Sequence, residues 1–180
     1  ETDPEVTEFM VDFGRDVLGK GVVVCKDTPN FIGNRFFAVA ASYGIEHGLQ
    51  SGYTVAEIDT ITGPQIGRPK TATFRLMDLV GLDVMGHVNK NLYEAVPHDS
   101  YRDILQPEKT AVLMAQMIEN KWLGNKTGQG FYKQDFINGQ RVFLTLDPET
   151  MTYIDGGSPR FDAISATRKV EDLGERLRKF

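Results

Sequence analysis

Two neighbouring polar residues, Asn34 and Arg35, stand near the expected start of a long apolar helix. They belong to the stretch DTPNFIGNRF, which follows the apolar triplet at 22–24 and reads as strand, turn and helix. An amide near a helix N-terminus adds a directed hydrogen bond to the positive end of the helix dipole. The two together suit a substrate oxygen that carries partial negative charge. Spacing alone favours the plainer alternative, in which Asn34 caps or packs the helix and Arg35 pairs with an acid.

Other residues that could carry chemistry follow weaker patterns. The three histidines, His47, His87 and His98, form no closely spaced pair and no cysteine cluster accompanies them, so the sequence predicts no metal site. Cys25 follows the valine triplet in the expected strand, which favours inert packing over a nucleophilic thiol. The run GNKTGQG at 124–130 lacks the spacing and the preceding strand of a phosphate loop, which favours a tight glycine turn.

The loop 63–70 combines two glycines and two prolines with the cations Arg68 and Lys70. Two interpretations stay open: a helix-to-helix connection with solvated charges, or one wall of a ligand cleft. Glycine and proline in a loop let the backbone approach a ligand without a side-chain clash, which supports the second interpretation. No G-x-G-x-x-G occurs in the chain, so we expect any nucleotide-binding strand and loop to lie outside it.

Composition sets the broad class of the protein. The chain has 180 residues, of which 41% are hydrophobic and 25% charged, as in ordinary globular domains. A net charge of -5 argues against a nucleic-acid partner, and no apolar run approaches the roughly 20 residues that span a bilayer. The N-terminus is acidic, unlike a secretory signal, and a single cysteine fits a reducing cytoplasm. The chain starts in mid-pattern at Glu1, as a piece of a longer protein would.

The apolar spacing predicts a mainly α fold with a short β-hairpin near the C-terminus. Helices are expected over 4–18, 28–52, 54–62, 71–96 and 107–124, the third with a capping box of Thr54 and Glu57. The run at 21–27 suits a strand buried on both faces, whose sheet lies elsewhere. Asn138-Gly139 predicts a hairpin turn, Asp147-Pro148 a second turn, 156–160 a linker and 161–180 one final amphipathic helix.

Three stretches in register, VVVCKDTPNFIGNRF, GRPKTATFRLMDLVGLDV and NKTGQGFYK, closely resemble the C-terminal domain of 3-hydroxyacyl-CoA dehydrogenases. The resemblance covers 20–133. The tail at 134–180 is similar to the insert that follows this domain in long members fused to an enoyl-CoA hydratase, which carry a second helical copy. Asn30 replaces the family's usual glycine and tolerates the left-handed φ of such a turn. The family's Met-Gly-Pro-Phe is absent from the second stretch, so no role is transferred to 68–73.

The resemblance implies a domain organisation. Residues 1–27 are expected to be the last helix and strand of a truncated Rossmann NAD-binding domain. Residues 28–133 would form the helical domain for substrate binding and dimerisation, and 134–180 a hairpin and a linker helix toward a missing domain.

The implied activity is NAD-dependent oxidation of an L-3-hydroxyacyl-CoA in fatty-acid β-oxidation, with NAD and a His–Glu pair in the missing N-terminal domain. Asn34 matches the family's motif asparagine, which hydrogen-bonds a substrate oxygen near the reacting carbon, so Asn34 is the expected catalytic residue and Arg35 a structural one. The chain alone is expected to be inactive. Its implied partners are the acyl-CoA substrate and either a second subunit, in a homodimer, or a second helical copy.

Two other functions stay open from the sequence. One is a non-catalytic helical assembly or acyl-CoA-binding module that keeps the fold without the chemistry. The other is a relative that acts on another hydroxy acid. Retention of Asn34 favours the dehydrogenase, and the similarity of the tail to fused members favours β-oxidation. The unpaired strand, the helical stripes and the tail are expected to leave apolar surface exposed.

Overall fold

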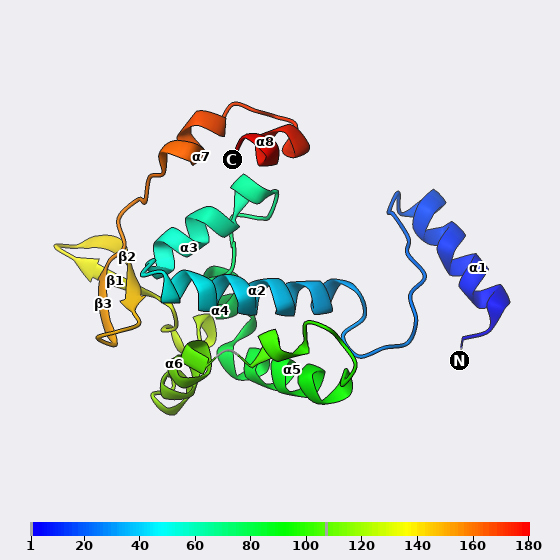
Figure 1. Ribbon diagram of the computed structural model, residues 1–180, viewed down its shortest axis with the longest axis horizontal. Coiled ribbons are helices and arrows are strands. Elements are labelled where there is room, and N and C mark those ends of the chain that lie inside the picture. The colour runs from blue at the N-terminus through cyan, green and yellow to red at the C-terminus, as the bar shows by residue number, and fades with distance from the viewer. Residues whose placement is uncertain (1, 107) are drawn as a thin grey trace.

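The computed structural model describes residues 2–106 and 108–180, and its N-terminal helix stands apart from the body (Figure 1). Helix α1 (Pro4–Asp12) begins where the Asp3 carboxylate accepts the Glu5 N–H at 2.8 Å, with proline at the first helical position. A π-helical turn, η1 (Phe13–Val17), continues it, and Gly19 ends it with φ of 61°. The helix predicted at 4–18 is thus confirmed, although none of the α1 residues is buried.

The strand predicted at 21–27 is wrong for this chain. The segment is extended but carries no strand, and Val22, Val23 and Val24 are 41%, 72% and 69% exposed. A strand needs a neighbour to pair its backbone N–H and C=O groups, and no described residue supplies one here. For the same reason the Cys25 side chain is exposed, which corrects the expectation that it packs in a core.

Five helices form the body, connected by short 3-10 turns. They are α2 (Gly33–Gln50), α3 (Val55–Thr62), α4 (Phe74–Val80), α5 (Leu82–Ala95) and α6 (Glu108–Glu119), with turns η2 (Pro64–Ile66), η3 (Arg102–Leu105) and η4 (Asn125–Thr127). Helix α2 runs through the middle of the body, with α3 above it and α5 below it in Figure 1. The predicted capping box is present, because Thr54 and Glu57 bond each other's backbone N–H.

Two predicted helices have different bounds in the structure. Helix α2 starts at Gly33 rather than at the proline four residues earlier, because Asn30 and Phe31 take left-handed φ angles of 62° and 49°. The left-handed conformation predicted for Asn30 is therefore present. The helix expected over 71–96 is divided into α4 and α5 by Gly81, whose φ of 103° lies outside the helical region.

The main core lies between α3, α4, α6 and the sheet. Its largest fully buried members include Phe74 and Phe131, whose ring centroids are 4.3 Å apart. A smaller cluster of Ala38, Leu92 and Leu105 lies under the N-terminal half of α2. The face of α2 that carries Ala38, Ala41 and Ile45 therefore lies against the protein's own interior, since all three are buried.

The sheet is a three-stranded antiparallel meander of β1 (Tyr132–Ile137), β2 (Gln140–Asp147) and β3 (Thr152–Asp155). Asn138 and Gly139 turn between the first two strands with φ of 52° and 77°, which confirms the predicted hairpin. The second predicted turn follows Asp147, whose carboxylate accepts the Glu149 N–H at 2.9 Å. The hairpin therefore gains a third strand.

The single final helix predicted over 161–180 is wrong. The structure has two short helices, α7 (Asp162–Thr167) and α8 (Leu173–Lys179), because Asp172 starts a new helix by accepting the Glu175 N–H at 2.7 Å. This tail returns over α3 and η2 (Figure 1). Within the described residues, no helix has the length and apolar character needed to cross a membrane.

Candidate functional site

Asn34 lies in the first turn of α2, at the exposed end of the face that carries Ala38. Its side chain is exposed and makes no hydrogen bond within the described residues. No side chain of the described residues caps this helix end, so the first N–H groups of α2 have no side-chain partner beside the exposed Asn34 amide. The alternative in which Asn34 caps or packs α2 does not fit this geometry.

Arg35 points to a different partner. Its guanidinium pairs with the Asp99 carboxylate, which also accepts the Tyr101 N–H at 3.0 Å. The backbone N–H and the Arg35 guanidinium together hold the pKa of Asp99 below its usual value. Arg35 thus ties α2 to the segment before η3, which agrees with the structural role expected for it.

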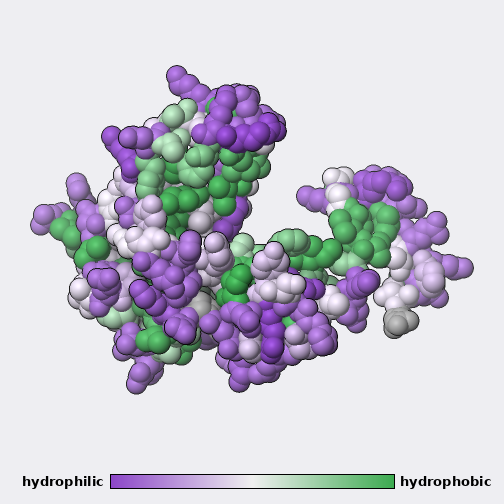
Figure 2. Space-filling model, in the orientation of Figure 1, coloured by the Kyte–Doolittle hydropathy of each residue, from purple (hydrophilic) through white to green (hydrophobic). Residues whose placement is uncertain are grey.

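An open apolar groove of about 600 Å³ runs beside this end of α2. The segment around Cys25 forms one side, and Phe36, Val39 and Tyr101 contribute to the other. Asn34 does not line this groove. Figure 2 shows hydrophobic surface on α1, on the connecting segment and on the nearby end of α2, where Phe36 is 74% exposed. The exposed apolar area expected from the sequence is therefore present at the N-terminal segment.

The second stretch that resembles the family, GRPKTATFRLMD, is organised by a buried carboxylate that the sequence analysis did not predict. Asp59 of α3 accepts the N–H groups of Thr73, Phe74 and Arg75 at 3.0, 2.7 and 3.1 Å, so it caps α4 from outside. The Tyr132 hydroxyl donates to the same carboxylate at 2.8 Å. One side chain thereby joins α3, α4 and β1.

A second buried carboxylate, Asp78, organises the glycine run that precedes β1. Its two oxygens accept the N–H groups of Phe131 and Tyr132, each at 2.8 Å. The backbone approaches so closely that a Cβ on Gly124 would lie 2.3 Å from the Asp78 carbonyl oxygen. A Cβ on Gly130 would lie 2.1 Å from Asp78 Oδ1. The run 124–130 is therefore a tight structural turn against α4, as expected from its lack of phosphate-loop spacing.

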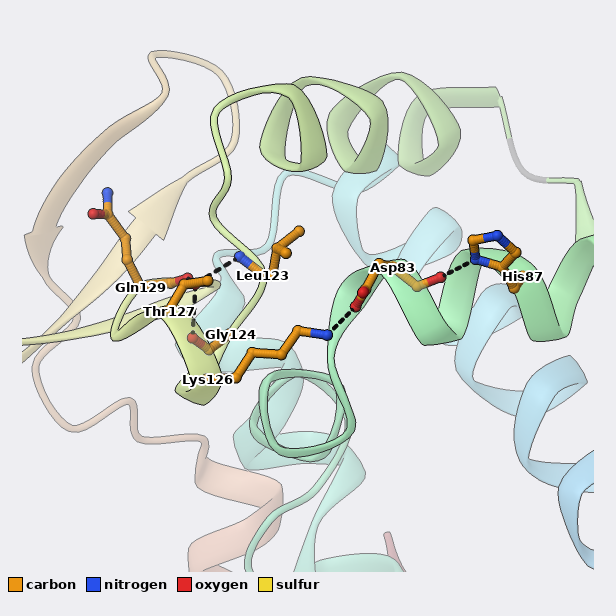
Figure 3. Close-up of polar contacts among 7 residues, drawn as sticks. All are labelled: Asp83, His87, Leu123, Gly124, Lys126, Thr127 and Gln129. Carbon is orange, nitrogen blue, oxygen red and sulfur yellow. Dashed lines mark hydrogen bonds and ion pairs between the residues drawn. The ribbon is translucent and has the colours of Figure 1, made fainter.

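Two polar side chains of the same run complete the turn (Figure 3). Lys126 Nζ donates to Asp83 Oδ1 at 2.5 Å, which connects the turn to the start of α5. Thr127 Oγ1 accepts the Leu123 N–H at 3.0 Å and lies 3.1 Å from the Gly124 carbonyl oxygen. Both side chains are thus used inside the fold.

Burial controls the ionisation of this network. Burial raises the pKa of Asp78 to about 6, although its two backbone N–H donors act in the opposite direction. It also raises the pKa of Asp59, and the nearby Asp59 carboxylate adds to the effect of burial on Tyr132, whose pKa is raised as well. At the surface, the hydrogen bond from Lys126 lowers the pKa of Asp83.

The loop 63–70 matches neither of its two interpretations in full. Arg68 donates to Thr73 Oγ1 at 3.0 Å and to the Ala72 carbonyl at 2.8 Å, and it lies 5.5 Å from the Phe37 ring centroid. Its charge is therefore used inside the fold rather than left in solvent. Lys70 is exposed.

The stretch that contains Asn34, the two buried carboxylates and the glycine turn also matches a known protein family. The family described as 3-hydroxyacyl-CoA dehydrogenase, C-terminal domain, matches residues 31–134, more than half of the chain. The chain belongs to this family. The match begins just before Asn34 and ends in β1, so it contains the end of α2, both buried carboxylates and the glycine turn.

Individual relatives extend the match. A Bacillus subtilis protein named as a 3-hydroxyacyl-CoA dehydrogenase is 42% identical over 178 residues, which is 99% of this chain and 22% of the relative. A Rickettsia prowazekii protein named as a fatty acid oxidation complex trifunctional enzyme is 31% identical over 150 residues, 83% of this chain and 20% of the relative. The crystal structure of FadB2 from M. tuberculosis superposes with a TM-score of 0.59 at 29% identity, covering 73% of this chain and 44% of that one. The chain thus spans about a fifth of the length of these two curated relatives.

The tail is part of the similarity, because the alignment with the B. subtilis relative continues through nearly all of the chain. The predicted resemblance to long family members is confirmed to this extent. The sequence reading found the stretch around Asn34 but missed Asp59 and Asp78. Each of these acids follows a buried apolar residue within a helix, Ile58 or Met77, and an acid at such a position is a recognisable signal.

Proposed function

We propose that this chain is the helical domain of an NAD-dependent L-3-hydroxyacyl-CoA dehydrogenase, and that Asn34 orients an oxygen of the acyl-CoA substrate. Family membership supports the activity. The observation that carries the role of Asn34 is its exposed amide in the first turn of α2, which bonds to no described residue. In the other two family-like stretches, polar side chains such as Asp78 and Thr127 form hydrogen bonds within the protein.

The described residues do not themselves fit a dinucleotide site. Such sites lie at the carboxyl ends of parallel strands, whereas β1, β2 and β3 form an antiparallel meander and the segment 20–27 is unpaired. We propose that NAD is held by another domain of a longer protein. Residues 1–27 would belong to that domain, 28–133 to the substrate domain and 134–180 to the connection with a following domain.

The contribution of Asn34 follows from electrostatics. Oxidation converts the C3 hydroxyl of the substrate into a carbonyl, so the oxygen at this carbon must be held in one orientation. The Asn34 amide can donate to that oxygen or to the neighbouring thioester oxygen, and the dipole of α2 favours a partial negative charge there. A fixed donor of this kind contributes about 3 kcal/mol to stabilising the transition state.

The test is Asn34→Ala in the full-length enzyme that contains this domain. We expect kcat to fall about a hundredfold and the Kd of NAD to stay nearly unchanged. Asn91→Ala, at another exposed helical asparagine, is the matched control and should leave kcat unchanged. Near-normal turnover of Asn34→Ala would exclude the proposed role, and the 180-residue chain alone should reduce no NAD.

The exposed apolar surface indicates how the domain assembles. We propose that the apolar face formed by α1, the segment 20–27 and the end of α2 packs against the missing domain, a second subunit or a second helical copy. A clean monomer of the isolated chain in light scattering would contradict self-association. The single exposed Cys25 accords with a cytoplasmic protein.

A further inference from the structure

A second cleft lies where the tail crosses α3 and η2, at a distance along the chain from Asn34. Its open volume is about 700 Å³, within the range of small-molecule sites. Thr60, Pro64 and Gln65 of the helical body form one side, and tail residues between Pro159 and Arg176 form the other. The buried hydrogen bond of 2.8 Å from Gln65 Nε2 to Thr167 Oγ1 holds the two sides together.

The charge of this cleft has one sign. Arg160, Arg168 and Arg176 line it, and its lining contains no aspartate or glutamate. Within residues 2–106 and 108–180, none of the three arginines forms a salt bridge. Three unpaired guanidinium groups around one cleft are unexpected in a chain with a net charge of -5.

Two carboxylates of the tail are used elsewhere. Asp172 caps α8, and Glu175 pairs with Lys179 at 2.5 Å. Arg176 donates through Nη1 to the Val170 carbonyl at 3.4 Å, while its Nε is buried without a partner. A buried donor without an acceptor destabilises the fold, and this one belongs to a guanidinium group that lines the cleft.

The uncharged polar groups around the cleft already donate their protons within the protein. The Thr60 hydroxyl donates to the Ala56 carbonyl at 2.8 Å, and the Ser165 hydroxyl donates to the Phe161 carbonyl at 2.9 Å. In the described part of the chain, Arg160 and Arg168 make no hydrogen bond to another residue, so their guanidinium groups are the free donors of the cleft. Guanidinium groups bind phosphate oxygens through two parallel N–H bonds, a geometry that neutral ligands do not match.

We propose that this cleft binds a ligand with at least two phosphate groups. The same chemistry is offered by the nucleotide end of a CoA thioester and by a free nucleotide or pyrophosphate. The proposal rests on the tail arginines and is independent of Asn34.

The binding test is isothermal titration calorimetry on the 180-residue chain at low salt. The probes are pyrophosphate, adenosine 3′,5′-bisphosphate, CoA and 3′-dephospho-CoA. We expect saturable binding that weakens as salt is raised, because the contacts are charge-assisted. Absence of binding by all four probes at millimolar concentration would overturn the proposal.

Variants locate the site. The double variant Arg160→Gln/Arg168→Gln should weaken binding at least about tenfold, since both side chains are exposed and their loss leaves the fold intact. Ser165→Glu places a carboxylate among the arginines and should weaken binding to a similar extent. Arg178→Gln, an exposed arginine of α8 outside the cleft, is the matched control. Equal binding by the double variant, Ser165→Glu and the wild type would overturn the proposed location.

The choice of probe distinguishes the two sources. Tighter binding of CoA than of pyrophosphate, with a loss on removal of the 3′-phosphate, would identify the nucleotide end of CoA. Equal binding of pyrophosphate and CoA would identify a free phosphate compound. Because these variants leave Asn34 intact, a failure here is distinguishable from a failure of the proposed catalytic role.

Discussion

The N-terminal stretch around Asn34 and the paired stretches around Asp78 use polar residues in opposite ways. At Asp78, both carboxylate oxygens accept backbone N–H groups of the same chain, and two glycines let the backbone segments approach closely. At Asn34, the amide is exposed and bonds to no residue that the structure describes, and the backbone before it contains two consecutive residues with left-handed φ. A polar side chain that is satisfied internally is explained by the fold, whereas one that is left free at a helix end needs a partner from outside.

The two regions should therefore respond differently to mutation. Substitutions around Asp78 should affect the free energy of unfolding, and substitution of Asn34 should affect turnover with little effect on stability.

The largest loss of stability is expected for Gly124→Ala. The new Cβ would lie 2.3 Å from the Asp78 carbonyl oxygen, and Gly124 has a φ of 97°. Overpacking and backbone strain together should lower the free energy of unfolding by about 4 kcal/mol. Urea denaturation measures the loss. The matched control is Gly128→Ala, which has a φ of 74° but no atom within 4 Å of the new Cβ, and it should cost only about 1 kcal/mol. Equal losses in the two variants would show that close packing against α4 is unimportant.

The next largest effect is a dependence of stability on pH between about 4 and 6. Burial raises the pKa of Asp78 from 3.8 to about 6, so the folded protein holds this proton more tightly than the unfolded chain does. The contribution of Asp78 to stability should therefore be largest below this window and fall by up to about 3 kcal/mol as the pH rises through it. Asp78→Asn removes this titration, so its urea midpoint should lose the part of the fall that is due to Asp78. The remaining slope combines Asp59, which acts in the same direction, with surface acids such as Asp83 and Asp99, which act in the opposite direction. An unchanged slope in Asp78→Asn would contradict the assignment.

A smaller effect is expected for Tyr132→Phe. The variant removes the hydroxyl that donates to Asp59 at 2.8 Å and keeps the ring under Arg75, whose guanidinium carbon lies 4.0 Å from the ring centroid. A hydrogen bond to a charged group contributes about 1.5 kcal/mol, so thermal unfolding should report a loss of that size. Tyr101→Phe, at an exposed tyrosine, serves as the control and should be neutral.

The smallest effect on stability is expected for Asn34→Ala. Its side chain is exposed and bonds to no described residue, so the free energy of unfolding should change by less than about 0.5 kcal/mol. A loss above about 1 kcal/mol would mean that Asn34 supports the fold, and the contrast with Asp78 would then fail.

Local signals in the sequence predicted the elements whose bonds are local. The capping box joins Thr54 to Glu57 three residues away, and the Asn138-Gly139 turn needs only its own two φ angles. The strand predicted around Val22–Val24 is absent because a strand forms only beside another strand, and the described residues supply none there. The prediction of one continuous final helix was wrong because the Asp172 side chain caps the N-terminus of a second helix, although the amphipathic pattern continues through this position.

The buried carboxylates show where local patterns end. Asp78 bonds residues 53 and 54 positions away, so no spacing rule connects them, and only their positions among buried apolar residues indicate that they are buried too. For Asn34, the position could be predicted from the sequence but the role could not. Its position near a helix start was predicted from the sequence, but nothing local distinguishes a substrate-binding amide from a cap.

The hydrogen bond between Gln65 and Thr167 also indicates the order in which parts of the chain fold. It joins residues 102 positions apart, whereas Asp59 and Phe74 are only 15 apart. On an unfolded chain, closing the longer loop costs about 1.7 kcal/mol more in entropy. Once the sheet has formed through β3, only the short stretch from Gly156 to Thr167 remains to be ordered. Among the segments that pack on the helical body, the tail should therefore dock last in folding and open first in hydrogen exchange, and the arginine cleft would be the latest part of that body to form.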